Sequence, residues 1–335
     1  MSQVVYHYTD VDTMLKIVAD NTIWATCINY LNDTSERSHY LMQIRNRIQS
    51  HHLPRESTPP GPPGSFTIFD DFLRWDDDDG IEIKHFVASF SGLPDSLPQW
   101  RSYCPRGNGV AIGFRVDCLK DATVKEREGP VPKEPDNTPA PANDPPESVD
   151  PNLSDEEKQL YAPIDWSPRV SFRKIDYVDE GPAGDQAPPP EAATVLDNDI
   201  AKACADAEKE VAESDPEIGY SESDAFMEII KANASFKKHK SFENEDEYRL
   251  LADAFWWGEE SYFRYRAKGS SLYPYVCLTI PRWASGQELK PFIERVVVGP
   301  TPNLKLSLAA VTSFLRTQGL DHAEVKKSEI PFRDW

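Results

Sequence analysis

Short strand-like segments alternate with helical segments along most of the chain, and this order leaves few possible folds. The strand-like segments are apolar, β-branched or aromatic, and they cover residues 4–9, 22–26, 85–91, 109–114, 170–178, 275–280, 293–299 and 323–326. Segments with helical periodicity lie between them, among others at residues 36–50, 192–210, 223–239 and 306–317. Short strands with helices between them predict a mixed α+β fold, formed by a single domain over residues 1–335.

Two segments break this pattern, residues 121–163 and residues 180–191. The first is rich in proline, acidic and amide residues, and the second is rich in proline and glycine. Apolar residues are too sparse in both to offset the conformational entropy that ordering would cost. We therefore predict two acidic, Pro-rich insertions that lie outside the core and that are dispensable for folding.

The charge balance and the cysteine pattern argue against several classes of protein. A formal net charge of −20 is unfavourable for general binding of nucleic-acid backbones, which requires a basic footprint. The five cysteines are scattered without a C-x-x-C pair, which is typical of reduced, buried thiols and of a cytoplasmic protein. No apolar run approaches the ~20 residues of a membrane helix, and the N-terminus lacks a signal peptide, so we expect no membrane association.

Most common catalytic motifs are missing from the chain. No set of His, Cys and Asp residues has the spacing of metal ligands, so we expect no metal ion. There is no glycine-rich phosphate loop and no nucleophile elbow. The acidity and the lack of metal-ligand spacing also count against a nuclease.

An acidic segment at residues 241–251 carries the clearest candidate chemistry. Glu245, Glu247 and Arg249 are two residues apart, so in a strand they share one face. Two carboxylates at this separation repel each other, which raises the pKa of one and leaves the other ionised. That arrangement suits acid–base chemistry or the stabilisation of a cation, with Arg249 as a candidate internal partner. The alternative is a solvated, charged edge strand.

Three further residues have both a functional and a structural interpretation. His7 lies on the first strand, where a lone histidine is more often structural than functional. Trp100 and Tyr103 are three residues apart in a short helical segment, so their side chains share a face. They belong either to the core or to the wall of a pocket, because aromatic faces stack well on planar ligands.

A set of short motifs resembles a known family. In chain order the motifs are Tyr6-His7-Tyr8-Thr9, Ile23-Trp24-Ala25, Leu31-Asn32-Asp33 with Glu36, Ser89-Phe90-Ser91, Trp100-x-x-Tyr103, Gly109-Val110-x-Ile112-Gly113-Phe114, Lys240 with Phe242-x-x-Glu245-x-Glu247-Tyr248-Arg249, Val297-x-Gly299 and Ser328-x-Ile330-Pro331-Phe332-Arg333. Together they resemble the bacterial domain-of-unknown-function family 2971 over nearly the whole chain, with the two acidic segments as insertions. That family is similar, more distantly, to the ADP-ribosyltransferase superfamily.

The resemblance implies a fold, a substrate and a set of site residues. The fold is an ADP-ribosyltransferase-like split β-sandwich around a cleft that binds NAD⁺ as the substrate. The implied catalytic residues are Glu247, Glu245 and His7. The implied NAD⁺-binding residues are His7, Tyr8, Thr9, Ser89, Ser91, Trp100, Tyr103 and Arg249. In this set His7 holds the ribose next to nicotinamide, and Ser89 or Ser91 lines the cleft. Tyr103 or Trp100 provides an aromatic face that stacks on the ligand.

The residue types suit cleavage of the bond between nicotinamide and ribose. This cleavage passes through an oxocarbenium-like state, as glycoside hydrolysis does. A carboxylate such as Glu247 opposes the developing positive charge, and preorganised groups of this kind contribute about 3–4 kcal/mol. Glu245 either orients or deprotonates an acceptor nucleophile or is a surface charge. We expect His7, Glu247 and at least one of Trp100 and Tyr103 to line one cleft.

We therefore predict a cytoplasmic, NAD-dependent ADP-ribosyltransferase-like enzyme that transfers ADP-ribose to a macromolecular acceptor, protein or nucleic acid. The resemblance also suggests a toxin or an antiviral defence effector, with a regulatory or antitoxin protein as a partner. One alternative is an NAD glycohydrolase, which transfers ADP-ribose to water. Another is a non-catalytic module of the same fold that binds a nucleotide or a protein.

Overall fold

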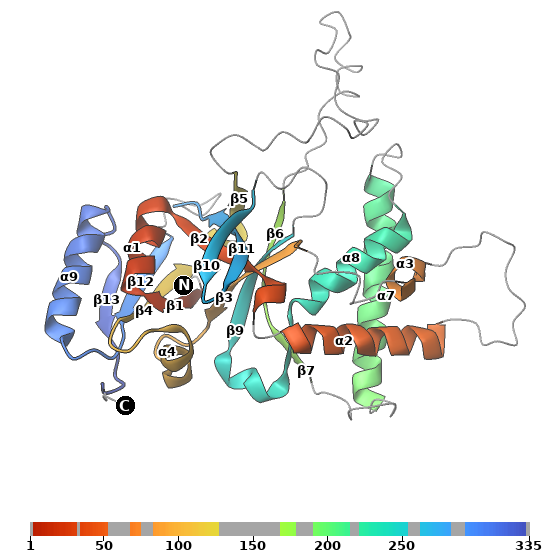
Figure 1. The fold of residues 1–335 in the computed structure, drawn as a ribbon, viewed down its shortest axis with the longest axis horizontal. Helices are drawn as coiled ribbons and strands as arrows, with labels where there is room; N and C mark the ends of the chain where they lie inside the picture. The colour runs from red at the N-terminus through yellow and green to blue at the C-terminus, as the bar shows by residue number, and fades with distance from the viewer. Residues whose placement is uncertain are drawn as a thin grey trace, which may run out of the picture.

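The computed structural model describes residues 3–31, 34–52, 68–74, 83–126, 168–178, 190–214, 221–253, 262–282 and 292–332 (Figure 1). A large sheet with its own core lies beside a group of helices. The α+β class expected from the order of strand-like and helical segments is confirmed. None of the helices in the described ranges is long and apolar enough to cross a membrane.

Most described strands join one 11-stranded sheet, in which every pair is antiparallel except β12 with β13. Its strands are β1 (Val4–Asp10), β2 (Thr22–Cys27), β3 (His85–Ser91), β4 (Gly109–Arg115), β5 (Thr123–Lys125), β6 (Arg169–Lys174), β9 (Glu247–Asp253), β10 (Arg264–Lys268), β11 (Ser271–Thr279), β12 (Ile293–Val298) and β13 (Glu324–Lys327). The main order is β10-β11-β2-β3-β1-β4-β12-β13, while β5 pairs with β11, and β6 and β9 extend from β3. A separate parallel pair contains β7 (Asp176–Val178) and β8 (Lys237–His239).

The sheet branches at β3. One edge of β3 pairs along its whole length with β9, so that Ser91 lies opposite Glu247. The other edge is shared, because β2 pairs with residues 86–87 near its beginning and β1 pairs with Ser91 at its end. Residues 88–90 have no strand partner on this second edge among the described residues. The sheet is therefore split where β1 and β2 diverge.

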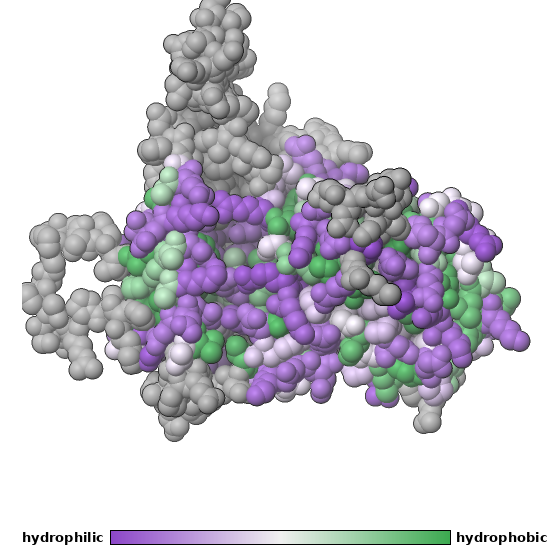
Figure 2. Space-filling view, turned by 180° about the vertical axis from the view of Figure 1, so that it is seen from behind, coloured by the Kyte–Doolittle hydropathy of each residue, from purple (hydrophilic) through white to green (hydrophobic). Residues whose placement is uncertain are grey.

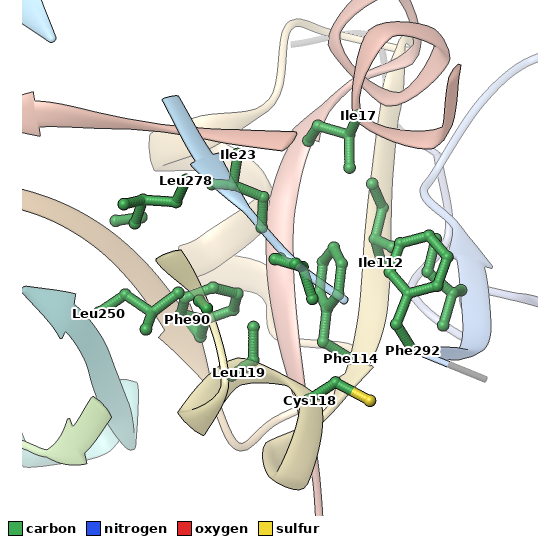
Figure 3. Close-up of a cluster of buried hydrophobic side chains, with 14 of the residues drawn as sticks. Ile17, Ile23, Phe90, Ile112, Phe114, Cys118, Leu119, Leu250, Leu278 and Phe292 are labelled. Atoms are coloured by element: carbon green, nitrogen blue, oxygen red, sulfur yellow. The ribbon is translucent and has the colours of Figure 1, made fainter. Parts of the chain in front are cut away.

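The main core packs around the sheet and is rich in aromatic contacts (Figure 3). The Phe114 ring centroid lies 5.8 Å from that of Phe90 and 6.1 Å from that of Phe292. Alternate residues of β3, among them Phe90, belong to this core. Because successive strand residues point to opposite faces, Ser89 and Ser91 point away from it.

The helices fall into two groups. Near the sheet lie α1 (Val11–Asp20), α4 (Leu97–Tyr103), α5 (Val116–Lys120) and α9 (Leu304–Thr317), and to one side of it lie α2 (Thr34–Arg47), α3 (Asp70–Arg74), α7 (Pro190–Glu213) and α8 (Glu222–Ala234) (Figure 1). The second group shares a core of its own, which includes Tyr40, Ile44, Phe72, Ile200 and Phe226. Shorter helical turns are η1 (Ile28–Tyr30), η2 (Ile48–His52) and η4 (Lys240–Glu245).

On the face opposite to that of Figure 1, hydrophilic residues predominate and hydrophobic residues occupy smaller areas between them (Figure 2). This agrees with a sequence in which 27% of the residues are charged.

Two segments expected to be continuous are divided. Residues 170–178 form two strands, because Ile175 is buried between β6 and β7 and only β6 joins the main sheet. The helical pattern expected to reach His239 ends at Ala234, and residues 237–239 form β8 instead.

The boundary expected for the start of the first insertion, at residue 121, is too early in the chain. Ala122 is buried in the main core, and β5 pairs with β11, so residues 121–126 belong to the folded sheet. The remainder, residues 127–163, lies outside the described residues. Of the second expected insertion, residues 180–189 also lie outside them, whereas Pro190 and Glu191 begin α7.

Candidate functional site

A cavity of about 470 Å³ lies where β1 and β2 diverge. Its wall is formed by residues of β1, β2, α1, α4 and β10, by residues 87–90 of β3 and by the junction of η4 with β9. Small-molecule sites typically measure ~300–1,000 Å³, so a ligand of this class fits. The residues predicted from sequence that line the cavity are His7, Tyr8, Thr9, Ser89, Tyr103, Glu245 and Glu247. The structure thus brings His7 together with Glu247, which lies far along the chain.

His7 closes part of the gap in the sheet. Its Nδ1 lies 3.0 Å from the carbonyl oxygen of Ser89, on the β3 edge that no described strand covers. A carbonyl oxygen only accepts hydrogen bonds, so Nδ1 carries the proton and Nε2 is the acceptor of the neutral ring. Burial lowers the pKa of His7 below the usual 6.5, although the hydrogen bond to Ser89 raises it. At neutral pH the ring is therefore uncharged.

Glu247 is ionised although it is buried. It is the first residue of β9, and 4% of its surface is exposed. Arg249 Nε lies 2.7 Å from Oε1, and Lys238 Nζ lies 3.0 Å from Oε2. Burial alone would raise the pKa of Glu247, but the two cations outweigh burial and hold that pKa below its ordinary value. Glu247 is therefore a carboxylate of the expected pair that stays ionised, and two cations rather than repulsion by Glu245 set its pKa.

Lys238 connects the two carboxylates. Its Nζ lies 2.8 Å from Glu245 Oε2 and also contacts Glu247. Glu245 is the last residue of the 3-10 turn η4, and Asp246, with a φ of 43°, turns the chain before β9 begins. The expectation that Glu245 shares a strand face with Glu247 and Arg249 is therefore wrong, because Glu245 approaches the cavity from a helical turn.

Three predicted site residues lie behind the cavity wall. Ser91 Oγ donates to the carbonyl oxygen of Glu245 at 2.7 Å and so fixes the end of η4. Arg249 is 2% exposed, and besides contacting Glu247 it donates to the carbonyl oxygen of Ser235, just after α8. Trp100 packs edge-on against Tyr8, with 4.6 Å between ring centroids, and borders a second cavity of about 350 Å³. Of the two aromatic candidates, Tyr103 lines the first cavity and Trp100 does not.

Sequence analysis missed a set of basic residues, which we call the basic wall: Lys16 of α1 and Arg266 and Lys268 of β10. They line the same cavity together with Trp24. Lys16 Nζ lies 5.6 Å from the centroid of the Trp24 ring, and Arg266 Cζ lies 5.7 Å from it. Arg266 and Lys268 alternate along the strand and share a face, and this spacing is the signal from which they could have been found.

One group of described residues has the composition of a metal site. His85, Glu228 and Asp253 offer ligand atoms that lie within 4.8 Å of one another. Lys84 Nζ and Lys231 Nζ, however, lie 3.5 Å and 4.0 Å from Glu228 Oε1. Because these ammonium groups compete with a metal ion for the carboxylate, we assign no metal to this group.

The comparison with protein families covers part of this site. Residues 99–250 match the family described as "Protein of unknown function (DUF2971)". The DUF2971 match includes Glu245, Glu247 and Tyr103, whereas His7 lies outside it. It supports the resemblance to this family that the motifs indicate, and it carries no link to the ADP-ribosyltransferase superfamily. No curated protein and no solved structure matches the chain.

Proposed function

We propose that the cavity binds NAD⁺ and that the protein cleaves the bond between nicotinamide and ribose. The observation that carries this proposal is that Glu247, ionised and 4% exposed, lines the same cavity as the uncharged ring of His7. A buried carboxylate that keeps its charge suits the stabilisation of a cation, because the low dielectric of the interior strengthens the attraction. The split of the sheet beside β3 and the motif resemblance also support an NAD⁺ cleft.

In the proposed reaction, the bond between ribose C1′ and the pyridinium nitrogen breaks, and its electron pair leaves with neutral nicotinamide. The ribose is left as an oxocarbenium-like species, whose positive charge Glu247 opposes. His7 Nε2 accepts a hydrogen bond from a ribose hydroxyl group, and Tyr103 offers an aromatic face to nicotinamide. A nucleophile then attacks C1′, and its proton passes to a base, for which Glu245 is the candidate.

The proposed acceptor is a macromolecule, protein or nucleic acid, and the product is then an ADP-ribosylated partner. The side chain of Glu245 is 22% exposed, compared with 5% for Glu247. A large acceptor therefore reaches Glu245 more readily than it reaches Glu247, which favours transfer. If water takes the place of the acceptor, the same chemistry gives an NAD glycohydrolase.

A second candidate function is a non-catalytic module that binds a nucleotide in the same cavity. Arg249 and Lys238 contact both oxygens of Glu247. Structural ion-pair networks have this arrangement and also perturb pKa values without any catalysis. The binding module and the enzyme differ in one outcome, which is whether NAD⁺ is consumed.

Release of free nicotinamide from NAD⁺ tests the proposed function. Glu247→Gln keeps the shape of the side chain but removes its charge. We expect nicotinamide release to fall about a hundredfold or more, the effect of losing one preorganised electrostatic group, with NAD⁺ affinity retained. Glu208→Gln, at an exposed position of α7, is the matched control and should release nicotinamide at the wild-type rate.

The alternatives give different results in the same assay. Wild-type protein that binds NAD⁺ without releasing nicotinamide would support the binding module. Equal release by wild-type protein and by folded Glu247→Gln would contradict the catalytic assignment of Glu247. Thermal denaturation of both variants separates a loss of chemistry from a loss of folding.

A further inference from the structure

The charges of the basic wall have no carboxylate partners in the described part of the chain. Lys16, Arg266 and Lys268 line the cavity, and none of them forms a salt bridge with a described residue. The other cations of the site, Lys238 and Arg249, are paired with glutamates. In a chain with a formal net charge of −20, carboxylates are abundant, so three unpaired cations around one cavity require an explanation.

The Arg266 side chain is fixed in place, but one of its hydrogen-bond donors has no acceptor among the described residues. Its Nη2 donates to Thr26 Oγ1 at 2.8 Å, which sets the orientation of the guanidinium group. Its Nε is buried and has no hydrogen-bond partner among the described residues. Burial also lowers the pKa of Arg266, so this cation is partly desolvated without a counter-charge. An anion in the cavity supplies both the missing acceptor and the missing charge.

Each of the three cations of the basic wall lies over an aromatic ring. Lys16 and Arg266 both contact the Trp24 ring, as described above. Lys268 Nζ lies 5.3 Å from the centroid of the Tyr273 ring. Tyr273 is in turn the cross-strand partner of Arg266 in the β10–β11 hairpin. Cation–π contacts of this kind preorganise the charges without neutralising them.

We infer that the basic wall is a subsite for the linked phosphate groups of a nucleotide. Arginine and lysine are the residues that bind phosphate oxygens through charged hydrogen bonds. The cavity volume of about 470 Å³ suits a small ligand, and the acidic remainder of the chain disfavours a nucleic-acid backbone. The inference rests on the proposed function for the choice of ligand class, but phosphate binding requires no bond cleavage.

Equilibrium binding of ADP and of adenosine tests the subsite, because these two ligands differ only in the diphosphate. We expect ADP to bind at least about tenfold more tightly than adenosine, and inorganic pyrophosphate to compete with ADP. Lys268→Gln and Arg266→Gln should each lower ADP affinity about tenfold and leave adenosine affinity nearly unchanged. Lys305→Gln, at an exposed position of α9 that does not line the cavity, is the matched control.

The outcomes separate this inference from the proposed function. Lys268 is exposed, so its replacement leaves the fold intact even if Arg266→Gln is unstable. Equal affinities for ADP and adenosine, or unchanged ADP binding by folded Lys268→Gln, would overturn the inference. ADP binding that depends on Lys268 in a protein that releases no nicotinamide would support the inference and contradict the proposed function.

Discussion

Lys238 and Arg249 place the two glutamates of the site in different surroundings. Glu247 contacts both cations and is nearly enclosed, whereas Glu245 contacts Lys238 and is more open to solvent. An enclosed, doubly paired carboxylate acts through its fixed charge. A carboxylate that is more open to solvent is able to take a proton from an approaching group. Under the proposed function, this difference suits Glu247 to bond cleavage and Glu245 to nucleophile activation.

Glu245→Gln should therefore lower the transfer of ADP-ribose to an acceptor while nicotinamide release persists. Loss of a general base typically costs about a hundredfold or more in the step that it serves. The measurement compares labelled ADP-ribose attached to macromolecules with free nicotinamide in the same reaction. Glu243→Gln, an exposed position on the same turn, is the control. A parallel loss of both products would show that Glu245 does not act on the nucleophile alone.

The sequence alone supports His7, Glu245 and Glu247 as candidates, because the order of the motifs and the two-residue spacing can be read directly from it. Lys238 precedes Glu245 and Glu247 by seven and nine residues, but this spacing alone does not show that its ammonium group contacts both carboxylates. The backbone of Lys238 is fixed by the pairing of β8 with β7, which places it opposite Tyr177. That pairing depends on a segment far along the chain, so the sequence alone shows the two carboxylates as a repelling pair.

Among the secondary-structure elements, the divided edge of β3 positions the cavity. The apolar pattern of β1, β2, β3 and β4 identifies each as a strand. The pattern does not show that β1 and β2 share one edge of β3, since strand pairing depends on contacts between distant segments. The existence of the strands was therefore predictable from sequence, and the location of the split was not.

A pair of deletions tests where the first insertion begins. Replacing residues 127–163 by a short Gly/Ser bridge should shift the melting temperature by less than about 3 °C, since the composition of this segment predicts no contribution to the core. Replacing residues 121–163 should lower the melting temperature further, because it also removes β5 and the buried Ala122. A large drop with the shorter deletion would show that residues 127–163 pack against the folded domain.

At the scale of the molecule, the two largest hydrophobic cores of the described residues lie around the sheet and among α2, α3, α7 and α8, and two smaller clusters accompany them. The α+β class follows from the order of elements along the chain. The division into these two cores cannot be predicted from that order. Helical periodicity indicates which face of a helix is buried but not what covers it. The centroid of the His7 ring lies 5.6 Å from that of Phe90 in the core around the sheet, and titration of His7 is expected to affect the stability of the fold.

The free energy of unfolding should fall as the pH drops below about 6.5, partly because of His7. The pKa of His7 is lowered in the folded protein, so between that pKa and 6.5 only the unfolded chain is protonated at this residue. Neutral His7 makes its full contribution to the free energy of unfolding above pH 6.5. As the pH falls from 6.5 towards the pKa of folded His7, this contribution decreases by up to about 1.4 kcal/mol per pH unit.

His7→Asn isolates this contribution, because the asparagine amide keeps an N–H donor for the carbonyl group of Ser89 but does not titrate. Urea denaturation between about pH 5 and pH 7 measures both proteins. The difference in unfolding free energy between wild type and variant should shrink as the pH falls. A difference that stays constant would show that His7 titrates alike in the folded and unfolded states.

The interruption in the pairing of β3 also bears on how a protein of this kind acquires new ligands. Each element of the cavity wall has its backbone held elsewhere, in a hairpin, in a helix or on another strand edge. Lys16 and Lys268 face the cavity and are not part of the main core. Substitutions at such positions change what the cavity accepts with little effect on folding. We therefore expect ligand preference to diverge among related chains more quickly than the architecture that surrounds it.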